Sequence, residues 1–327
     1  GDYPLIPYLI EIKILHGLTT KKVDQVRAFL KEYKGTPLES RVLRPWLRYL
    51  AKNNRKSLFM EFYEPMGDIK LTCQYLRYQL EDNVNKDQLY SQIADLWNVS
   101  KSQPKDCDPV FKKWKADAQL TEELILQRIA KAANGGQYSI ITYLRTLLPE
   151  DKKYLADLWY ETRKSPSTVR RLNVFKGNYP DIETEIISYG LGRLIWRNKA
   201  ESVKTWQRAQ KKFTLTDEQQ ANVATKFAIS MAISKHQDAE YWLIKSELLE
   251  QDPEVLRWHL ATLLKDQNWP SIINLIEQAS PTLTRAHEYQ YWLARSYAEL
   301  GNDNKANELF KQLAGERHYY GFLASAR

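Results

Sequence analysis

The clearest chemical pattern in this sequence is a tryptophan surrounded by lysines. Lys112, Lys113 and Lys115 flank Trp114 within four consecutive positions. Lysine ammonium groups pair readily with carboxylates, and an indole ring can stack on a sugar face or on a nucleobase. An ordinary solvated helix face is the favoured interpretation of these lysines. Contact with a glycan or with peptide carboxylates is the functional alternative, and binding of single-stranded nucleic acid is a weaker one.

Two further basic clusters raise the same possibilities. Arg170 and Arg171 follow Arg163 and Lys164 across a short turn, and Lys211–Lys212 end a helical pattern. The formal charge of the chain is +8 and its isoelectric point is near 9.1. Such a balance indicates a surface attracted to polyanions, of which nucleic acid is one.

Other chemistries have little support in the sequence. No HExxH pattern and no cysteine–histidine cluster is present to bind a metal, and no GxxxxGK[ST] or GxGxxG loop is present to bind a nucleotide. We therefore predict no metal and no cofactor. The five histidines are scattered along the chain: His16, His236, His259, His287 and His318.

The two cysteines allow a single intrachain bridge. A bond between Cys73 and Cys107 would close a loop of about 35 residues and stabilise the fold by about 4 kcal/mol in the chain-entropy model. Two unrelated free thiols are the alternative. Either cysteine as a nucleophile would need a histidine partner, and none is identifiable.

Composition predicts an all-α fold that positions these residues. Only 12 of 327 residues are glycine, where about 7% is usual, and the 13 prolines fall mostly between periodic segments. This favours many short helices with brief connections over a sheet-rich protein. With 10 Trp and 20 Tyr, most aromatic rings are expected to fill space between the helices.

Apolar residues recur at helical spacing along most of the chain. Examples are Val26 with Phe29, and Trp46 with Leu47 and Leu50. Helix starts are predicted at Thr121 and at the Thr216–Gln219 capping box, and helix ends at Asn134–Gly136 and Gly301, where a left-handed backbone is expected.

These segments predict a superhelical array of antiparallel helical hairpins, curved or ring-shaped, in which stability is local. The repeats are degenerate, and only the hairpin at 288–313 is close to a tetratricopeptide unit. The stretch 177–181 is the predicted meeting point of two sub-arrays.

Three segments carry a resemblance to a known family. They are Tyr3–Leu9 (YPLIPYL), Lys101–Pro104 (KSQP) with Cys107, and Arg317–Ala324 (RHYYGFLA). In this order they resemble the long helical domain of soluble lytic murein transglycosylases, and the resemblance covers essentially the whole chain.

The resemblance implies a scaffold domain over residues 1–327 that closes into a ring. The linker and catalytic domains of the family are expected outside this sequence. It also implies a Cys73–Cys107 disulfide, an oxidising periplasmic compartment, and peptidoglycan as the polyanionic partner, with cell-wall synthesis proteins as further partners. No membrane span is predicted, and nucleic acid becomes unlikely as a partner.

The family's chemistry uses a glutamic acid that protonates the glycosidic oxygen and then acts as base, which gives a 1,6-anhydro product. That residue is followed by Ser and, further on, by Gly-Leu-Met-Gln. Here Glu39-Ser40 and Glu201-Ser202 are Glu-Ser pairs, but no such tetrapeptide follows either. Both pairs are expected in exposed stretches, and we predict no catalytic residue.

The resulting hypothesis is a non-catalytic helical scaffold of a periplasmic peptidoglycan-cleaving enzyme, inactive alone. The scaffold would position the catalytic domain, the glycan, or both. The alternative is a free-standing tetratricopeptide-like adaptor for peptides or acidic proteins. Nucleic-acid binding is a third possibility, supported only by charge.

Overall fold

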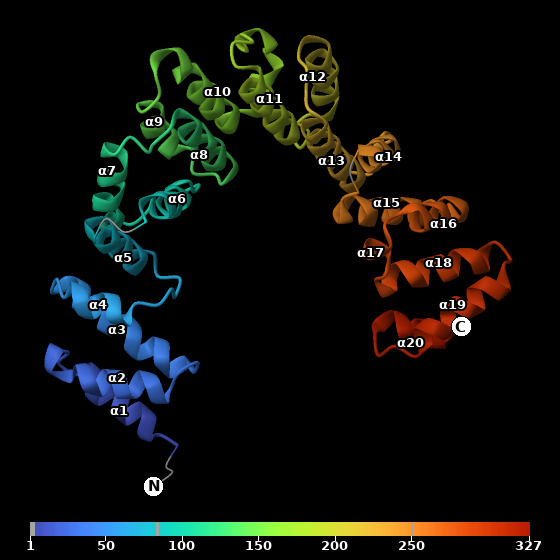
Figure 1. The fold of residues 1–327 in the computed structure, drawn as a ribbon. Helices are drawn as coiled ribbons and strands as arrows, with labels where there is room; N and C mark the ends of the chain where they lie inside the picture. Colours follow the sequence, from blue (N-terminus) through green and yellow to red (C-terminus); the bar gives the residue numbers. More distant parts are fainter. Residues whose placement is uncertain (1–3, 83–84, 250) are drawn as a thin grey trace. The chain divides into compact units, whose positions relative to one another are not determined.

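Every regular element in the described part of the chain is a helix. The computed structural model describes residues 4–82, 85–249 and 251–327, and no strand occurs among them. The all-α prediction is therefore confirmed, as is the succession of helical hairpins (Figure 1). Of the YPLIPYL segment, Tyr3 lies outside the described residues.

The chain folds as two compact units, Gly1–Ala156 and Asp157–Arg327. The division falls inside helix α10 (Lys153–Lys164). The joint at 177–181, which composition predicts as the meeting point of two sub-arrays, lies within the second unit, just before α11 (Pro180–Leu194).

The first unit is built from short helices, including three 3₁₀-helices among its described residues. They are α1 (Ile6–Leu15), η1 (Thr20–Lys22), α2 (Val23–Glu32), α3 (Pro37–Lys52), α4 (Lys56–Phe62), α5 (Ile69–Asp82), α6 (Lys86–Trp97), η2 (Lys105–Cys107), α7 (Asp108–Ala116), α8 (Glu122–Asn134), α9 (Ser139–Arg145) and η3 (Glu150–Lys152).

The predicted apolar stripes of the first unit meet in its core. Val26 and Phe29 of α2 are buried, as are Trp46, Leu47 and Leu50 of α3. Helix α3 packs against α1, α2, α4 and α5, so it is the central helix of this part of the unit. The 3.6-residue period brings these side chains to one face because residues three and four apart are neighbours on a helix.

The second unit continues the same architecture. After α10 its elements are η4 (Pro166–Arg170), η5 (Leu172–Val174), α11 (Pro180–Leu194), α12 (Lys199–Lys212), α13 (Asp217–Ile233), α14 (Ala239–Leu249), α15 (Pro253–Lys265), α16 (Trp269–Gln278), α17 (Pro281–Thr284), α18 (His287–Glu299), α19 (Asp303–Ala314) and α20 (Tyr319–Ser325).

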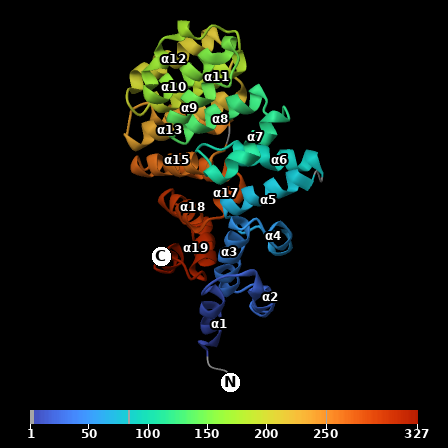
Figure 2. The same cartoon turned by 90° about the vertical axis from the view of Figure 1, so that its left-hand side faces the viewer.

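The hairpin expected at 288–313 is formed by α18 and α19. The two helices lie side by side in both views (Figures 1 and 2) and pack extensively on each other. Tyr291 and Ala294 of α18 and Ala306 and Phe310 of α19 belong to one buried cluster. Small residues between large ones let these two helices approach closely.

The predicted helix boundaries are present. The Thr121 hydroxyl accepts a hydrogen bond from Leu124 N at 3.2 Å. The Thr216 hydroxyl accepts from Gln219 N while the Gln219 amide oxygen accepts from Thr216 N, which completes the capping box. Gly301, after α18, has a φ of 75°, a conformation that glycine adopts without strain.

Candidate functional site

The lysine-flanked tryptophan lies on α7, where its two residue types separate onto different faces. Val110, Phe111 and Trp114 recur at helical spacing and are all buried, and the Trp114 ring is 1% exposed. It packs against Trp97 of α6 with 5.8 Å between ring centroids. Trp114 is therefore a core residue. The interpretation in which its ring stacks on a sugar or a base is wrong, because the ring is not accessible.

The three lysines around Trp114 have different surroundings. Lys113 forms an ion pair with Asp117 one turn further along α7. Lys115 donates a hydrogen bond to the hydroxyl of Tyr143 on α9 at 3.0 Å, and its ammonium also lies 5.6 Å from the centroid of that ring. Lys112 is exposed and has no ion-pair partner among the described residues.

Lys112 and Lys115 line a hollow of about 580 Å³ in the first unit, and Lys113 does not. The end of α6 and the segment that precedes η2 form one side, and α7, α8 and α9 form the rest. Its residues are Trp97, Ser102, Gln103, Asp108, Phe111, Lys112, Lys115, Arg128, Ser139, Ile140 and Tyr143. The volume falls in the range of small-molecule sites.

Arg128 is the hollow's third cation, and it is only 4% exposed. Its Nε donates to the carbonyl of Val99 and its Nη2 to that of Lys101, each at 3.2 Å. The guanidinium lies 4.3 Å from the centroid of the Trp97 ring. Burial lowers the pKa of Arg128 to about 10, so the group remains charged at neutral pH.

Sequence reasoning missed Arg128, although a signal was present. It lies between Ile125 and Ile129 on the buried face of α8, where a charged residue interrupts an apolar stripe. Charged residues are almost never fully buried unless they are paired, so this position indicates a special environment.

The second basic pair, Arg170 and Arg171, belongs to the second unit. Arg170 forms an ion pair with Glu201 of α12, with 3.2 Å between Nε and Oε1. Arg171 is exposed at the end of η4. Exposed ion pairs contribute little to stability, about 0–1 kcal/mol.

The glutamate of each Glu-Ser pair has a hydrogen-bond or ion-pair partner within the protein. Glu39, in the first turn of α3, accepts a hydrogen bond from Gly35 N at 2.7 Å. Glu201 is in the ion pair just described, and the Ser202 hydroxyl donates to the carbonyl of Asn198 at 2.8 Å. Ser202 is fully buried, so the expectation that both pairs are exposed was wrong for the second.

The cysteines form a disulfide between α5 and η2. Cys73 and Cys107 are both buried, with 4.9 Å between their Cα atoms. This confirms the pairing that the family resemblance implies. The bond anchors the end of the segment that carries Ser102 and Gln103, two residues of the hollow.

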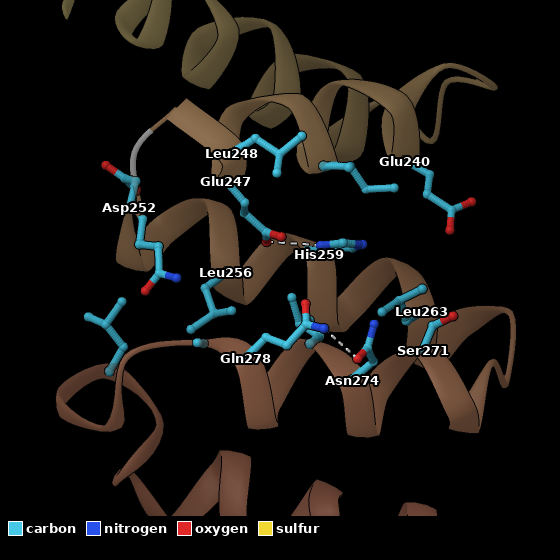
Figure 3. A pocket seen from close by; sticks show the side chains of 15 residues that line it. Glu240, Glu247, Leu248, Asp252, Leu256, His259, Leu263, Ser271, Asn274 and Gln278 are labelled. Carbon is cyan, nitrogen blue, oxygen red and sulfur yellow. Dashed lines mark hydrogen bonds and ion pairs between the residues drawn. The ribbon is translucent and has the colours of Figure 1, made fainter.

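A second concavity, of about 340 Å³, lies in the second unit between α14, α15 and α16 (Figure 3). Glu247 of α14 and His259 of α15, two of its lining residues, are in contact, with 2.9 Å between Oε1 and Nδ1. On the opposite wall the amide of Gln278 donates to the side-chain oxygen of Asn274 at 2.8 Å. His259 is buried, and its partner Glu247 lies on the neighbouring helix, so the sequence alone did not indicate this pair.

This groove combines acidic and apolar side chains. Glu240 and Asp252 lie at its two ends in Figure 3, and its described lining residues include no lysine or arginine. Two of its lining leucines differ in exposure: Leu248 is 82% exposed, whereas Leu256 is buried. Asp252 also accepts hydrogen bonds from the first turn of α15, which fixes the position of its carboxylate.

The described residues contain neither a metal-binding cluster nor a membrane-spanning helix. No group of three or more histidine, cysteine, aspartate or glutamate side chains among them is placed to hold a metal ion. Within the same residues, no helix has both the length and the apolar character needed to cross a membrane.

The described part of the chain is an all-helical array with one concavity in the first unit and another in the second. The chain is similar to the soluble lytic murein transglycosylases of Escherichia coli and Salmonella typhimurium, at 22% and 23% identity over 343 and 330 aligned residues. All of this chain is covered in each case, and it spans about half the length of these curated relatives. No family model matches.

Solved structures give the same result. An inactive mutant of the lytic transglycosylase Slt from Pseudomonas aeruginosa matches with a TM-score of 0.87 at 27% identity, covering 100% of this chain and 53% of that one. The 70 kDa soluble lytic transglycosylase from Escherichia coli matches with a TM-score of 0.80 at 20% identity, with the same coverage. The resemblance to soluble lytic murein transglycosylases is therefore confirmed over the whole of this chain.

Proposed function

We propose that this chain is a helical scaffold of a peptidoglycan-cleaving lytic transglycosylase and carries no catalytic residue of its own. The scaffold positions glycan strands, the catalytic domain, or both. The observation that carries the proposal is a similarity that extends over the full chain and about half of each relative. The product of the whole protein would be 1,6-anhydromuropeptides.

The surroundings of the two Glu-Ser pairs support the non-catalytic part. A glycosidic general acid needs a free carboxyl group with a raised pKa in a substrate cleft. Glu39 instead accepts a backbone N–H at the start of α3, and Glu201 is paired with Arg170. Neither lines one of the two concavities described above.

The disulfide supports a periplasmic location for the scaffold, since such bonds persist in oxidising compartments. The positive net charge suits a polymer whose peptides carry carboxylates. Lys112 and Lys115 in the first unit and Arg171 in the second are the candidate contacts, and cell-wall synthesis proteins are candidate partners.

One experiment with purified sacculi tests both parts of this proposal, the lack of catalysis and the contact with glycan. The chain is incubated with sacculi, the soluble fraction is analysed by mass spectrometry, and the pellet is assayed for bound protein. We expect bound protein and no anhydro-muropeptides above a mock-purified control. Release of these products would contradict the non-catalytic assignment, and the absence of binding at low salt would contradict direct glycan positioning.

The groove of the second unit favours one other function, a peptide-binding adaptor. Its acidic ends and exposed Leu248 suit a peptide with basic residues around an apolar anchor (Figure 3). A fluorescent basic amphipathic peptide, titrated against the chain and a Leu248→Asp variant, tests this. Binding that the variant loses supports an adaptor, and equal binding or none removes its structural support.

A further inference from the structure

The first unit buries a positive charge without a negative partner. Arg128 is 4% exposed, and no carboxylate among the described residues lies within ion-pair distance of it. Its protein partners are two neutral carbonyls and the face of Trp97. Because burying an unpaired charge is strongly unfavourable, such a group normally has a counter-charge or contacts a ligand.

The rest of the hollow increases this imbalance. Lys112 and Lys115 add two ammonium groups, while Asp108, which is exposed, is the only acidic residue among the described lining residues. Gln103 also has a buried side-chain oxygen without a hydrogen-bond partner in the described part of the chain, although its amide nitrogen donates to the carbonyl of Leu96. The hollow therefore offers cations for an anion and one acceptor for an N–H or O–H group.

Aromatic rings define the kind of molecule that would carry this anion. Trp97, Phe111 and Tyr143 line the hollow, and Tyr143 is half exposed. Rings of this kind pack well against the apolar face of a sugar or the side chain of a short peptide. Because Nε and one N–H of Nη2 already donate to the carbonyls of Val99 and Lys101, the N–H groups that Arg128 has left for a carboxylate are those of Nη1 and the second one of Nη2.

We propose that this hollow binds a small organic carboxylate, either the acid group of an acidic amino sugar or the C-terminal carboxylate of a short peptide. Arg128 and Lys112 take the carboxylate, the aromatic rings take the attached body, and Gln103 accepts a hydrogen bond from it. The choice of these two sources rests on the proposed function; the preference for a carboxylate rests on the hollow itself.

Isothermal titration of the chain with four probes tests the inference. N-acetylmuramic acid and N-acetyl-D-alanyl-D-alanine carry the carboxylate; N-acetylglucosamine and the C-terminal amide of the peptide lack it. We expect at least one acid to bind about 10-fold or more tightly than its neutral counterpart, and the tighter acid identifies the source. Equal affinities within both pairs, or no binding, would overturn the inference.

Variants locate the binding. Arg128→Gln is expected to weaken the acid about 30-fold or more, as removal of a buried charged partner does. Lys112→Gln, at an exposed position that leaves the core intact, is expected to weaken it a few-fold. The matched control is Lys113→Gln, one residue away but outside the hollow. Thermal unfolding of each variant verifies folding, and if Arg128→Gln does not fold, Lys112→Gln against Lys113→Gln decides. Equal loss in those two would overturn the assignment.

Pelleting with sacculi separates this inference from the proposed function. Acid binding without retention on sacculi would support the hollow and contradict the proposed scaffold contact with glycan. Retention on sacculi without binding of either acid would support the scaffold and overturn the hollow as a carboxylate site.

Discussion

The hollow of the first unit and the groove of the second are made from the same kind of element but have opposite charge. Both lie among short antiparallel helices. The hollow contains Arg128, a buried cation whose protein partners are neutral. In the groove, the nearly buried His259 is matched by Glu247 at 2.9 Å (Figure 3).

This difference shows that similar helical surroundings can produce concavities with opposite charge. In the groove the protein satisfies its own buried polar group, so what remains for a partner is an apolar edge with acidic ends. In the hollow, the charge of Arg128 has no acidic partner among the described residues and is available to a ligand. The functional information is therefore in a few side chains that break the apolar pattern.

The largest expected effect concerns the Cys73–Cys107 disulfide, which lies near the hollow and has no counterpart near the groove. Replacing Cys73 and Cys107 together by serine should lower the free energy of unfolding of the first unit by about 4 kcal/mol, because the open loop regains conformational entropy. The segment with Ser102 and Gln103 should also loosen. Hydrogen exchange measured by mass spectrometry would record both effects.

The second unit is the internal control for this experiment. Exchange in α14, α15 and α16 should remain unchanged, since stability in a helical array is local. Equal acceleration in both units would show that they unfold as one cooperative body, and the comparison of two independent concavities would fail.

The next effect concerns the groove. His259→Leu should destabilise the second unit by about 1–3 kcal/mol, because the Glu247 carboxylate loses its partner in a partly buried position. Glu240→Gln, a change at an exposed carboxylate of the same groove, is the matched control and should stay within about 0.5 kcal/mol. Urea unfolding measures both, and similar values would refute a structural role for the pair.

A pH-dependent effect is expected in the first unit at the start of α5, the helix that carries Cys73. Burial raises the pKa of Asp68, but hydrogen bonds from Arg48 at 2.8 Å and from the N–H of Leu71 outweigh it and hold that pKa below its usual value. The stabilisation is therefore present above the unfolded pKa of about 3.9 and is lost as pH falls through the lower folded value.

Asp68→Asn tests this sign. At pH 7 the variant should be less stable by about 1–2 kcal/mol, since it keeps a helix-capping oxygen but loses the charge. Below about pH 3 the difference between variant and parent should shrink. Thermal unfolding at several pH values measures it, and a difference that is constant with pH would show that the charge is not responsible.

The sequence predicted most of the fold because the fold depends on local patterns. The stripe of Trp46, Leu47 and Leu50 is buried as expected, and Thr121 and Thr216 cap the helices that they precede. These features need only the 3.6-residue period and the hydrogen bonds of the first turn, so no long-range information is required.

The candidate site was predicted only in part, and its residues show why. Lys112 and Lys115 were identified because a run of lysines around a tryptophan can be recognised from the sequence alone. Trp114 was a candidate contact because of its lysine neighbours, but its spacing from Val110 and Phe111 places it in the core, as expected for most of the aromatic rings. The surroundings of Arg128 arise where α8 packs against Trp97 of α6 and the Val99 carbonyl. This arrangement is tertiary structure, which local sequence patterns do not reveal.

The smallest expected effect compares one helix start in each unit. Thr216→Ala removes one side of a capping box and should destabilise α13 by about 1 kcal/mol. Thr121→Ala removes the single hydrogen bond to Leu124 N at the start of α8, the helix that carries Arg128. Because Gln219 keeps its own hydrogen bond to Thr216 N, the two losses should be similar, although the motifs differ. Chemical denaturation gives both values. If Thr121→Ala also weakens carboxylate binding, the hollow depends on the position of the start of α8. If it does not, the contacts of Arg128 with Val99, Lys101 and Trp97 are sufficient to hold it.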